Sequence, residues 1–430
     1  MSRTSTLKTA FLTGSAHLSR IAVGFLLVKV IAYYLGPEGM GGIGHFMSLA
    51  TIVYMVAGGG ITNAVIKYAS EYNQQPRRLL RMIDVSASYS LVCCLIVGVV
   101  GIVFSGPVAS LVFADSGKWW LVAMLALAQF FYAYVNLVVG VANGLLATHV
   151  YSRIQISGSL LAALLVTGLV SSQGFVGAAL AVMAIYLAPA CGAVYFHLRS
   201  SFRGRVRLVT PGRDEVLRLA RFSGMMIVSA ASFPVVEMIV RQLLIKDAGY
   251  EEAGLWQGLI KLSSAYLGFF TIFLSYYFMP LISRESSKVV IKRLTLKMLA
   301  AVVLLFLVGA GVLYAGRGFF ITYLLSAEFG RAADYLSYQL VGDGFRVAAY
   351  VIGFVAIAKA SVRLYVAAEI LQNGMFLLLA HLFSLSASGA LPVVQAYAVT
   401  YLIYFIVALA CFAVYVGRRS RKGGVDAVPR

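Results

Sequence analysis

Apolar stretches of about 20 residues recur from one end of the chain to the other, and this pattern restricts the fold more than any other feature. Each stretch is long enough to cross ~30 Å of hydrocarbon as a helix. Only 12% of the residues are charged, which is about half the share in a typical soluble domain. No segment between the stretches is long enough to form a separate soluble domain. The sequence therefore predicts an all-α integral membrane protein.

Twelve transmembrane helices are predicted from these stretches. The predicted spans are 11–34, 43–66, 84–105, 119–145, 154–171, 175–197, 222–245, 253–282, 298–316, 333–358, 364–385 and 391–416. The connection 317–332 is apolar but too short to span a bilayer, so we expect an interfacial or re-entrant piece there.

Lys and Arg outside the predicted spans lie mostly at the two termini and in the loops that follow even-numbered spans. Arg77, Arg78 and Arg81 follow the second span, and a run of arginines occupies 199–221 after the sixth. The positive-inside rule then places both termini in the cytoplasm, which an even number of spans allows. The net charge of +19 is explained by topology and by contact with anionic membrane lipid, so no nucleic acid partner is expected.

An internal repeat appears when the chain is shifted against itself by about 212 residues. Residues 28–46 then lie over 240–258, with Lys29 on Arg241 and Gly42 on Gly254. The repeat predicts two six-helix lobes, residues 1–209 and 210–430, related by a pseudo-twofold axis along the membrane normal. Transporters with such duplicated lobes bind their substrate where the lobes meet.

Several charged residues lie inside the predicted spans, where each costs ~2.5–3.5 kcal/mol if it faces lipid at the midplane. The bases are Arg20, Lys29, Arg241, Lys261 and Arg346, and the acids are Glu237, Asp343 and Glu369. Because this cost is large, we expect these side chains to face one another or a wet cavity. Bases outnumber acids, so a cavity that they line would be positive and would prefer an anion.

Helical spacing groups the charged residues into stripes. Gln339, Asp343, Arg346 and Tyr350 are spaced by four, three and four residues, which puts all of them on one helix face.

Glu237 and Arg241 form an acid-then-base pair one turn apart, and Pro234 is expected to kink their helix. The pairs Glu237–Arg241 and Asp343–Arg346 could instead be closed ion pairs that only hold helices together. Lys29 and Lys261 favour the cavity, since neither has an acid within one turn on its own helix.

Arg20 precedes Lys29 by nine residues and therefore points to the opposite helix face. We expect it to extend toward the cytoplasmic surface, although whether Arg20 and Glu369 face the cavity stays open. The predicted substrate-binding residues are Lys29, Glu237, Arg241, Lys261, Gln339, Asp343, Arg346 and Tyr350. The carboxylates of Asp343 and Glu237 would weaken anion binding or carry a proton.

Five segments carry a family resemblance. They are "YLGPEGMGGIGHF", "GGGITNAVIKYASEYN", "GLWQGLIKLSSAYLGFF", "YQLVGDGFRVAAYVIGFVAIAKAS" and "LYVAAEI". In these segments the chain resembles the Wzx-type flippases of undecaprenyl-diphosphate-linked oligosaccharides, of the multidrug/oligosaccharidyl-lipid/polysaccharide exporter superfamily.

The resemblance implies transfer of a lipid-linked sugar unit from the cytoplasmic to the periplasmic leaflet of a bacterial inner membrane. The glycan would serve a surface polysaccharide such as enterobacterial common antigen (lipid III) or O-antigen. It also implies polymerase and chain-length proteins of the same pathway as partners, and leaves coupling to protons or sodium ions open.

Two other functions stay open at this point. A multidrug or metabolite antiporter of the same superfamily would have similar helices. A membrane glycosyltransferase or polymerase would need a sizeable outer loop with catalytic residues, and the outer loops here are short. The sequence has no phosphate-binding Walker motif, no zinc-protease motif and no Cys/His cluster, so we expect no catalytic residue, cofactor or metal.

Overall fold

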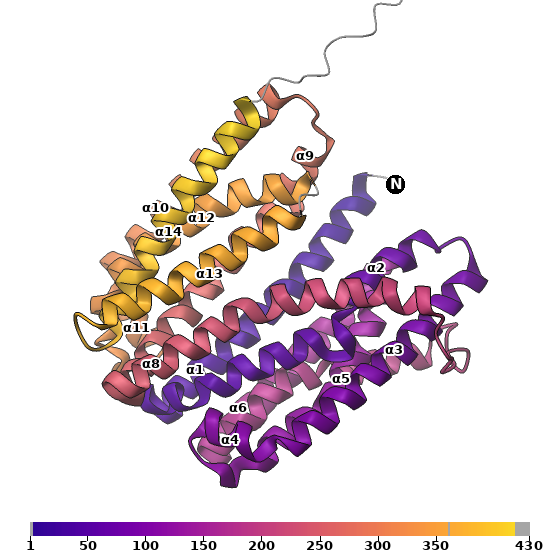
Figure 1. Cartoon of the computed structure of the whole chain (residues 1–430), viewed down its shortest axis with the longest axis horizontal. Coiled ribbons are helices and arrows are strands. Elements are labelled where there is room, and N and C mark those ends of the chain that lie inside the picture. Colours follow the sequence, from indigo (N-terminus) through magenta and orange to yellow (C-terminus); the bar gives the residue numbers. More distant parts are fainter. Residues whose placement is uncertain (1–2, 360–361, 418–430) are drawn as a thin grey trace, which may run out of the picture.

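The computed structural model describes residues 3–359 and 362–417, and every regular element in these residues is helical (Figure 1). The N-terminal elements are α1 (Arg3–Val56), η1 (Ala57–Gly60), α2 (Thr62–Glu71), α3 (Pro76–Val103), α4 (Ser105–Phe113), η2 (Ser116–Lys118), α5 (Trp119–Gly144), α6 (Thr148–Leu187) and α7 (Pro189–Leu198). The C-terminal elements are α8 (Arg213–Phe273), η3 (Leu274–Phe278), α9 (Met279–Arg284), α10 (Lys288–Ala315), α11 (Arg317–Leu324), η4 (Ala327–Phe329), α12 (Ala332–Ala358), α13 (Val362–Ser384) and α14 (Ala390–Gly417).

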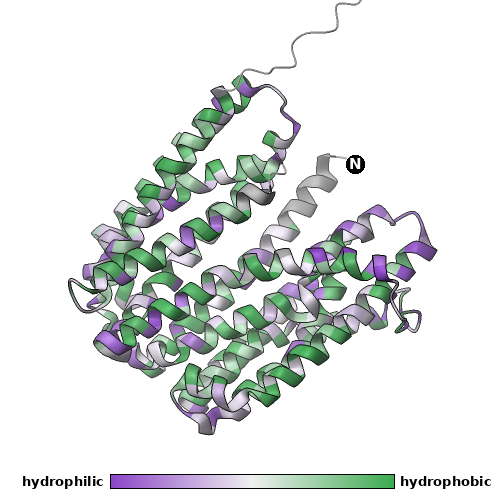
Figure 2. Ribbon diagram, in the orientation of Figure 1, coloured by the Kyte–Doolittle hydropathy of each residue, from purple (hydrophilic) through white to green (hydrophobic). Residues whose placement is uncertain are grey.

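Nine helical segments in the described residues are long and apolar enough to cross a membrane. Their ribbons are coloured mostly hydrophobic (Figure 2), and many of their large apolar side chains are exposed, as a lipid-facing surface requires. Helix α10 alone exposes Leu304, Leu305, Leu307 and Val308. The protein is therefore a multi-pass membrane protein.

Three of the nine segments are much longer than a bilayer needs, with 60, 51 and 72 residues. Each is interrupted at a glycine with a positive φ angle, which a residue without Cβ adopts readily. The breaks are at Gly36 (φ 62°) in α1, Gly174 (φ 55°) in α6 and Gly249 (φ 87°) in α8. The predicted kink at Pro234 is not where α8 breaks, because its non-helical dihedral angles are at Gly249.

The elements form two bundles that meet along α1 and α8. Figure 1 shows α2–α7 on one side and α9–α14 on the other, with α1 and part of α8 between them. Helix α1 packs extensively against both α6 and α8, and α12 packs against α14. The connection 317–332 contains only α11 and η4, which are too short to span, as predicted. The division into domains at 209/210 stays a prediction.

The bundles touch backbone to backbone just after the breaks in α1 and α8. A Cβ atom added to Gly254 would lie 1.7 Å from the carbonyl oxygen of Pro37, and one added to Gly41 would lie 2.1 Å from that of Tyr250. Neither position therefore accommodates a side chain in this conformation. The contact closes the space between the bundles at the end where α1 and α8 turn.

Candidate functional site: a cationic cavity between the bundles

A cavity of about 720 Å³ lies between the two bundles. Its walls come mainly from α1, α6, α8 and α12, and it ends before the contact of Gly41 with Tyr250. The charged residues that line it are Arg20, Lys261 and Arg346, and no carboxylate among the described residues does so. Aromatic side chains add to the lining, including Tyr54, Tyr186, Tyr276 and Tyr350.

Arg20 lines the cavity, which answers the question that the sequence left open for this residue. Its guanidinium carbon lies 5.9 Å from the centre of the Tyr54 ring. The expected opposition of Arg20 and Lys29 holds, but the cavity lies on the side of Arg20. The nine-residue spacing thus predicted that Arg20 and Lys29 lie on opposite faces of α1. It did not predict which of the two faces lines the cavity.

Lys29 lies away from the cavity lining and is bound to backbone. Its Nζ donates to the carbonyl oxygens of Tyr323 at 2.6 Å and Leu325 at 2.8 Å. These carbonyls are at the C-terminal end of α11, where a helix leaves acceptors unsatisfied and attracts positive charge. Lys29 therefore fastens α1 to the short helix α11, which explains a cation without a carboxylate partner.

Lys261 lines the cavity and has a carboxylate neighbour that helical spacing did not reveal. Its Nζ lies 3.7 Å from Oε1 of Glu237, and 23% of its side chain is exposed against 4% for Glu237. The second carboxylate oxygen of Glu237 accepts a hydrogen bond from Ser48 at 3.4 Å. Lys261 is thus partly compensated, contrary to expectation, because its partner is on another turn of α8 beyond the break at Gly249.

Arg241 is fully buried and is not part of the cavity lining. Its Nη2 donates to Oε1 of Gln257 at 2.5 Å, and its guanidinium lies 5.8 Å from the Trp256 ring. A Cβ on Gly44 of α1 would lie 2.5 Å from its Nε. The predicted ion pair with Glu237 is not formed, since Glu237 pairs with Lys261 instead. Arg241 is therefore packed where α1 meets α8.

Arg346 enters the cavity from α12 without an ion pair to Asp343. Its Nη1 donates to the hydroxyl of Tyr397 at 3.0 Å. The guanidinium carbon lies 5.1 Å from the Tyr401 ring and 5.7 Å from the Tyr350 ring, so aromatic faces surround it. Its Nε is buried without a hydrogen-bond partner. The side chain as a whole is only partly buried and lines the cavity, so its exposed atoms are available to an acceptor there.

Asp343 is fully buried in the C-terminal bundle and is saturated with donors. Its carboxylate accepts hydrogen bonds from Tyr397 at 2.6 Å, from Ser263 at 2.7 Å and from the hydroxyl of Tyr266. Gln339 adds a longer contact of 3.4 Å. The four residues of the predicted stripe therefore have two different environments. Gln339 and Asp343 are buried inside the bundle, while Arg346 and Tyr350 line the cavity.

Comparisons with known proteins agree with this architecture. The sequence model of the family described as "Polysaccharide biosynthesis protein" matches residues 6–285. The "Lipid III flippase" of Escherichia coli (strain K12) is 32% identical over 416 residues, covering 96% of this chain and 99% of that protein.

Among solved structures, an inward-facing multidrug resistance MATE family transporter of the MOP superfamily aligns with a TM-score of 0.75 and 15% identity, over 96% of this chain and 100% of that one. An outward-facing transporter of the same family aligns with a TM-score of 0.61 and 14% identity, over 95% of both chains. The alignments with the flippase and with these two transporters each include both bundles of the chain. The chain belongs to the polysaccharide biosynthesis protein family and is a membrane transporter rather than an enzyme.

Proposed function

We propose that the protein flips undecaprenyl-diphosphate-linked oligosaccharides from the cytoplasmic to the periplasmic leaflet of a bacterial inner membrane. The observation that carries this proposal is the lining of the 720 Å³ cavity, which has three cations and no carboxylate among the described residues. The relative in Escherichia coli is named for the same class of reaction.

The three cations would bind the diphosphate. Arg346 presents a planar guanidinium already fixed by Tyr397 and by the surrounding rings, so little side-chain entropy is lost when it binds a phosphate. Lys261 and Arg20 supply two further charges from α8 and α1. Charge-assisted hydrogen bonds of this kind are roughly twice as strong as neutral ones.

The polar aromatic wall beside Arg20 suits a glycan. Tyr54 and Tyr186 stack with their ring centres 4.3 Å apart, and the Tyr186 hydroxyl lies 3.2 Å from Thr51. Tyrosines of this kind offer an apolar face and a hydrogen-bonding tip to a sugar ring. The polyprenyl tail would stay in the bilayer while the head group occupies the cavity.

Neither Glu237 nor Asp343 reaches the cavity lining, and each acts through a cation in this proposal. Glu237 reduces the charge of Lys261, which would keep diphosphate binding reversible. Asp343 fixes Tyr397, which in turn orients Arg346. Protonation of either carboxylate would change the field in the cavity and is the route by which an ion gradient would be coupled.

Alternating access would move the head group across the membrane. The higher TM-score against the inward-facing structure, 0.75 compared with 0.61, supports assignment of this conformation to the inward-facing state. The backbone contact of Gly41 with Tyr250 would then close the periplasmic end, and the bundles would rock to open it.

The broken helices support two lobes, each of which crosses the membrane six times. If each of the three long segments crosses twice, nine segments give twelve crossings. Gly36 and Gly249 occupy similar positions in α1 and α8 and have similar backbone angles, with ψ −169° and 179°. This similarity supports a pseudo-twofold relation between the lobes, and the arginine-rich connection between α7 and α8 supports cytoplasmic termini.

Export of cationic drugs is the main rival, because the fold is shared with multidrug transporters. A site for a lipophilic cation needs an acid in its wall, and this cavity presents three bases instead. The charge of the cavity therefore favours the anionic substrate.

Deletion of the gene tests the proposal. We expect an undecaprenyl-diphosphate-linked oligosaccharide to accumulate on the cytoplasmic face, and the wild-type gene to restore its transfer. Arg346→Ala should fail to restore transfer while reaching the membrane in normal amount. Normal transfer of every such lipid in the deletion strain would refute the function, and full rescue by Arg346→Ala would remove Arg346 from the mechanism.

A further inference from the structure

A second cavity, of about 320 Å³, lies apart from the central one where α2, α3 and the start of α8 meet. Its lining residues are Tyr68, Tyr72, Arg77, Arg78, Arg81, Met82, Val85, Ser86, Glu215, Arg218 and Leu219. Four arginines and one glutamate give this lining a formal charge of +3. The positive-inside rule accounts for basic residues at this end of the molecule but not for the gathering of four arginines around one cavity.

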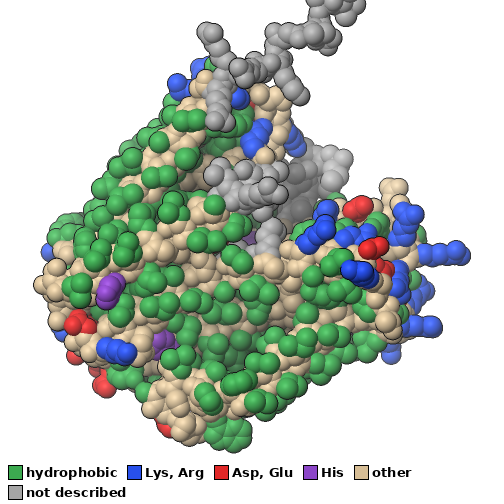
Figure 3. All heavy atoms as spheres, viewed as in Figure 1, with side chains coloured by type: hydrophobic (Ala, Val, Ile, Leu, Met, Phe, Trp, Pro, Cys, Tyr) green, Lys and Arg blue, Asp and Glu red, His purple; other side chains and the backbone are tan. Residues whose placement is uncertain are grey.

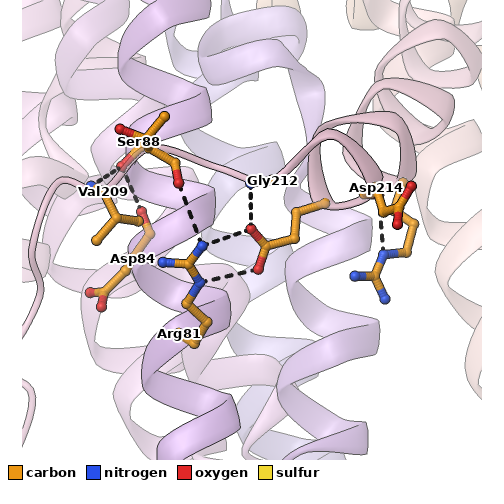
Figure 4. Close-up of polar contacts among 9 residues, drawn as sticks. Arg81, Asp84, Ser88, Val209, Gly212 and Asp214 are labelled. Atoms are coloured by element: carbon orange, nitrogen blue, oxygen red, sulfur yellow. Dashed lines mark hydrogen bonds and ion pairs between the residues drawn. The ribbon is translucent and has the colours of Figure 1, made fainter.

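The single carboxylate in the cavity is already used by one arginine. Arg81 donates from Nε to Oε1 of Glu215 at 3.1 Å and from Nη2 to Oε2 at 2.9 Å, a two-pronged pair (Figure 4). Glu215 also accepts from the backbone nitrogen of Gly212 at 2.8 Å, which fixes its orientation. Glu215 therefore holds Arg81 in place and has little capacity left for another cation.

The other three arginines form no direct ion pair with a carboxylate among the described residues, although Arg218 lies close enough to Glu215 to interact with its charge. Arg77 and Arg78 are exposed at the start of α3, which begins at Pro76. Arg218, one turn after Asp214 in α8, donates only to the carbonyl oxygen of that residue, at 3.3 Å. The start of a helix carries partial positive charge and mildly disfavours cations, so an anion bound between these two arginines would relieve the repulsion.

The cavity has the construction expected at a membrane surface. Met82, Val85 and Leu219 are buried and form an apolar floor beneath the arginines. Tyr68 and Tyr72 stack at its side with ring centres 6.1 Å apart, and tyrosine is enriched where hydrocarbon meets water. Figure 3 shows Lys and Arg side chains gathered at this end of the molecule, next to the hydrophobic surface.

We propose that this cavity is a binding site for the phosphate headgroup of an anionic phospholipid. The guanidinium groups of Arg77, Arg78 and Arg218 would bind the phosphodiester, and free N–H groups in the first turn of α3 would add donors. This cavity has room for a phosphodiester, with a volume of about 320 Å³, and it shares no lining residue with the central cavity. The site is therefore distinct from that of the transported substrate.

A lipid bound here would fasten α8 to the N-terminal bundle. Leu219 packs in one cluster with Ile61 and Val65 of that bundle, and Ser223 of α8 lies 2.9 Å from the Tyr89 hydroxyl of α3. Helix α8 continues from this contact to Lys261 in the central cavity. The headgroup would strengthen an existing contact and so stabilise the protein against unfolding.

Lipid retention by the purified full-length protein tests the site. The protein is transferred from detergent into phosphatidylcholine vesicles with and without phosphatidylglycerol, and lipid that stays bound on return to mild detergent is counted by native mass spectrometry. The test variant is Arg77→Gln/Arg78→Gln. The control is Arg203→Gln/Arg205→Gln, which removes the same charge from exposed residues of the α7–α8 connection outside the cavity.

Wild type and control should retain phosphatidylglycerol over phosphatidylcholine, and the test variant should lose this preference by roughly tenfold or more. Phosphatidylglycerol should also raise the thermal unfolding midpoint of wild type and control but not of the test variant. All three proteins should unfold at similar temperatures in lipid-free detergent, since both substituted pairs are exposed.

Three outcomes would overturn the proposal. Equal retention by the test variant would show that the arginines do not bind lipid. An equal loss of phosphatidylglycerol retention in the control variant would show that the lipid is attracted by the general positive charge and not by this cavity. Inorganic phosphate that displaces phosphatidylglycerol and gives the same thermal shift alone would make the cavity a site for soluble phosphate. None of these outcomes bears on transport of the oligosaccharide.

Discussion

Arg346 and Asp343 lie one turn apart on the same face of α12, yet the hydroxyl of Tyr397 stands between them. It accepts from Arg346 at 3.0 Å and donates to Asp343 at 2.6 Å. The carboxylate therefore stays inside the C-terminal bundle and the guanidinium stays in the cavity. This arrangement keeps a cation near an acid without neutralising it by direct contact.

Removal of the Tyr397 hydroxyl should impair transport more than it impairs folding. Tyr397→Phe leaves Asp343 with one donor fewer and frees Arg346 to turn toward it, at a cost of about 1–3 kcal/mol for the lost partner. We expect initial transport rates into proteoliposomes to fall about tenfold, since ~1.4 kcal/mol corresponds to that factor. The matched control is Tyr401→Phe, whose hydroxyl accepts from Gln372 at 2.8 Å instead. Equal rates in the two variants would contradict an orienting role for Tyr397.

Neutralisation of Glu237 should tighten binding of the head group and slow its release. Glu237→Gln leaves the charge of Lys261, 3.7 Å away, uncompensated in the cavity. We expect a lower KM for the lipid-linked oligosaccharide together with a lower maximal rate, and the opposite change in KM for Lys261→Gln. Steady-state transport at varied substrate densities separates the two parameters. A raised KM in Glu237→Gln would contradict the proposed function of this carboxylate.

Substitution of Gly254 should disfavour the conformation seen here. In Gly254→Ala the new Cβ would lie 1.7 Å from the Pro37 carbonyl oxygen, so the contact that closes one end of the cavity must separate. Overpacking of this kind costs about 1–3 kcal/mol. We expect cysteines introduced into the cavity to become more reactive toward an impermeant thiol reagent from the periplasmic side.

The control for that experiment is Gly224→Ala in the same helix, where a Cβ would meet nothing within 4 Å. Unchanged periplasmic labelling in Gly254→Ala would place the closing contact elsewhere.

Thiol labelling also tests the two opposite faces of α1. Arg20→Cys should react with a hydrophilic reagent added from the cytoplasmic side, because Arg20 lines the cavity. Lys29→Cys should not, because Lys29 lies against the carbonyls at the end of α11. Both are introduced into protein whose native cysteines have been replaced. Protection of the cysteine at position 20 combined with labelling at position 29 would reverse our assignment of the faces.

Helices and charged stripes were predictable because each depends on the spacing of residues within one helix. The placement of Arg346 and Tyr350 together on one face of α12 follows from spacing alone. Partners on other helices, or on the far side of a break in the same helix, were not predictable, since spacing carries no information about them. Glu237 thus pairs with Lys261 rather than with Arg241, its neighbour by spacing, and Lys29 is bound to carbonyls of α11.

The breaks at Gly36 and Gly249 fall in the connections 35–42 and 246–252 between predicted spans. What the sequence did not show is that helical dihedral angles resume directly after each glycine, so that each connection is a sharp break within a long helix. At Pro234, where a kink was expected, α8 keeps helical dihedral angles.

Direct binding by the purified protein tests most sharply the claim that the cavity cations hold a diphosphate-linked oligosaccharide. The measurement is the affinity for an undecaprenyl-diphosphate oligosaccharide of wild type and of the triple variant Arg20→Gln/Lys261→Gln/Arg346→Gln. We predict a loss of at least about a hundredfold, since three charge-assisted contacts of ~1.5–3 kcal/mol each are removed. Equal affinity in the two proteins, or wild-type binding of a lipophilic cation in preference to this lipid, would contradict the account.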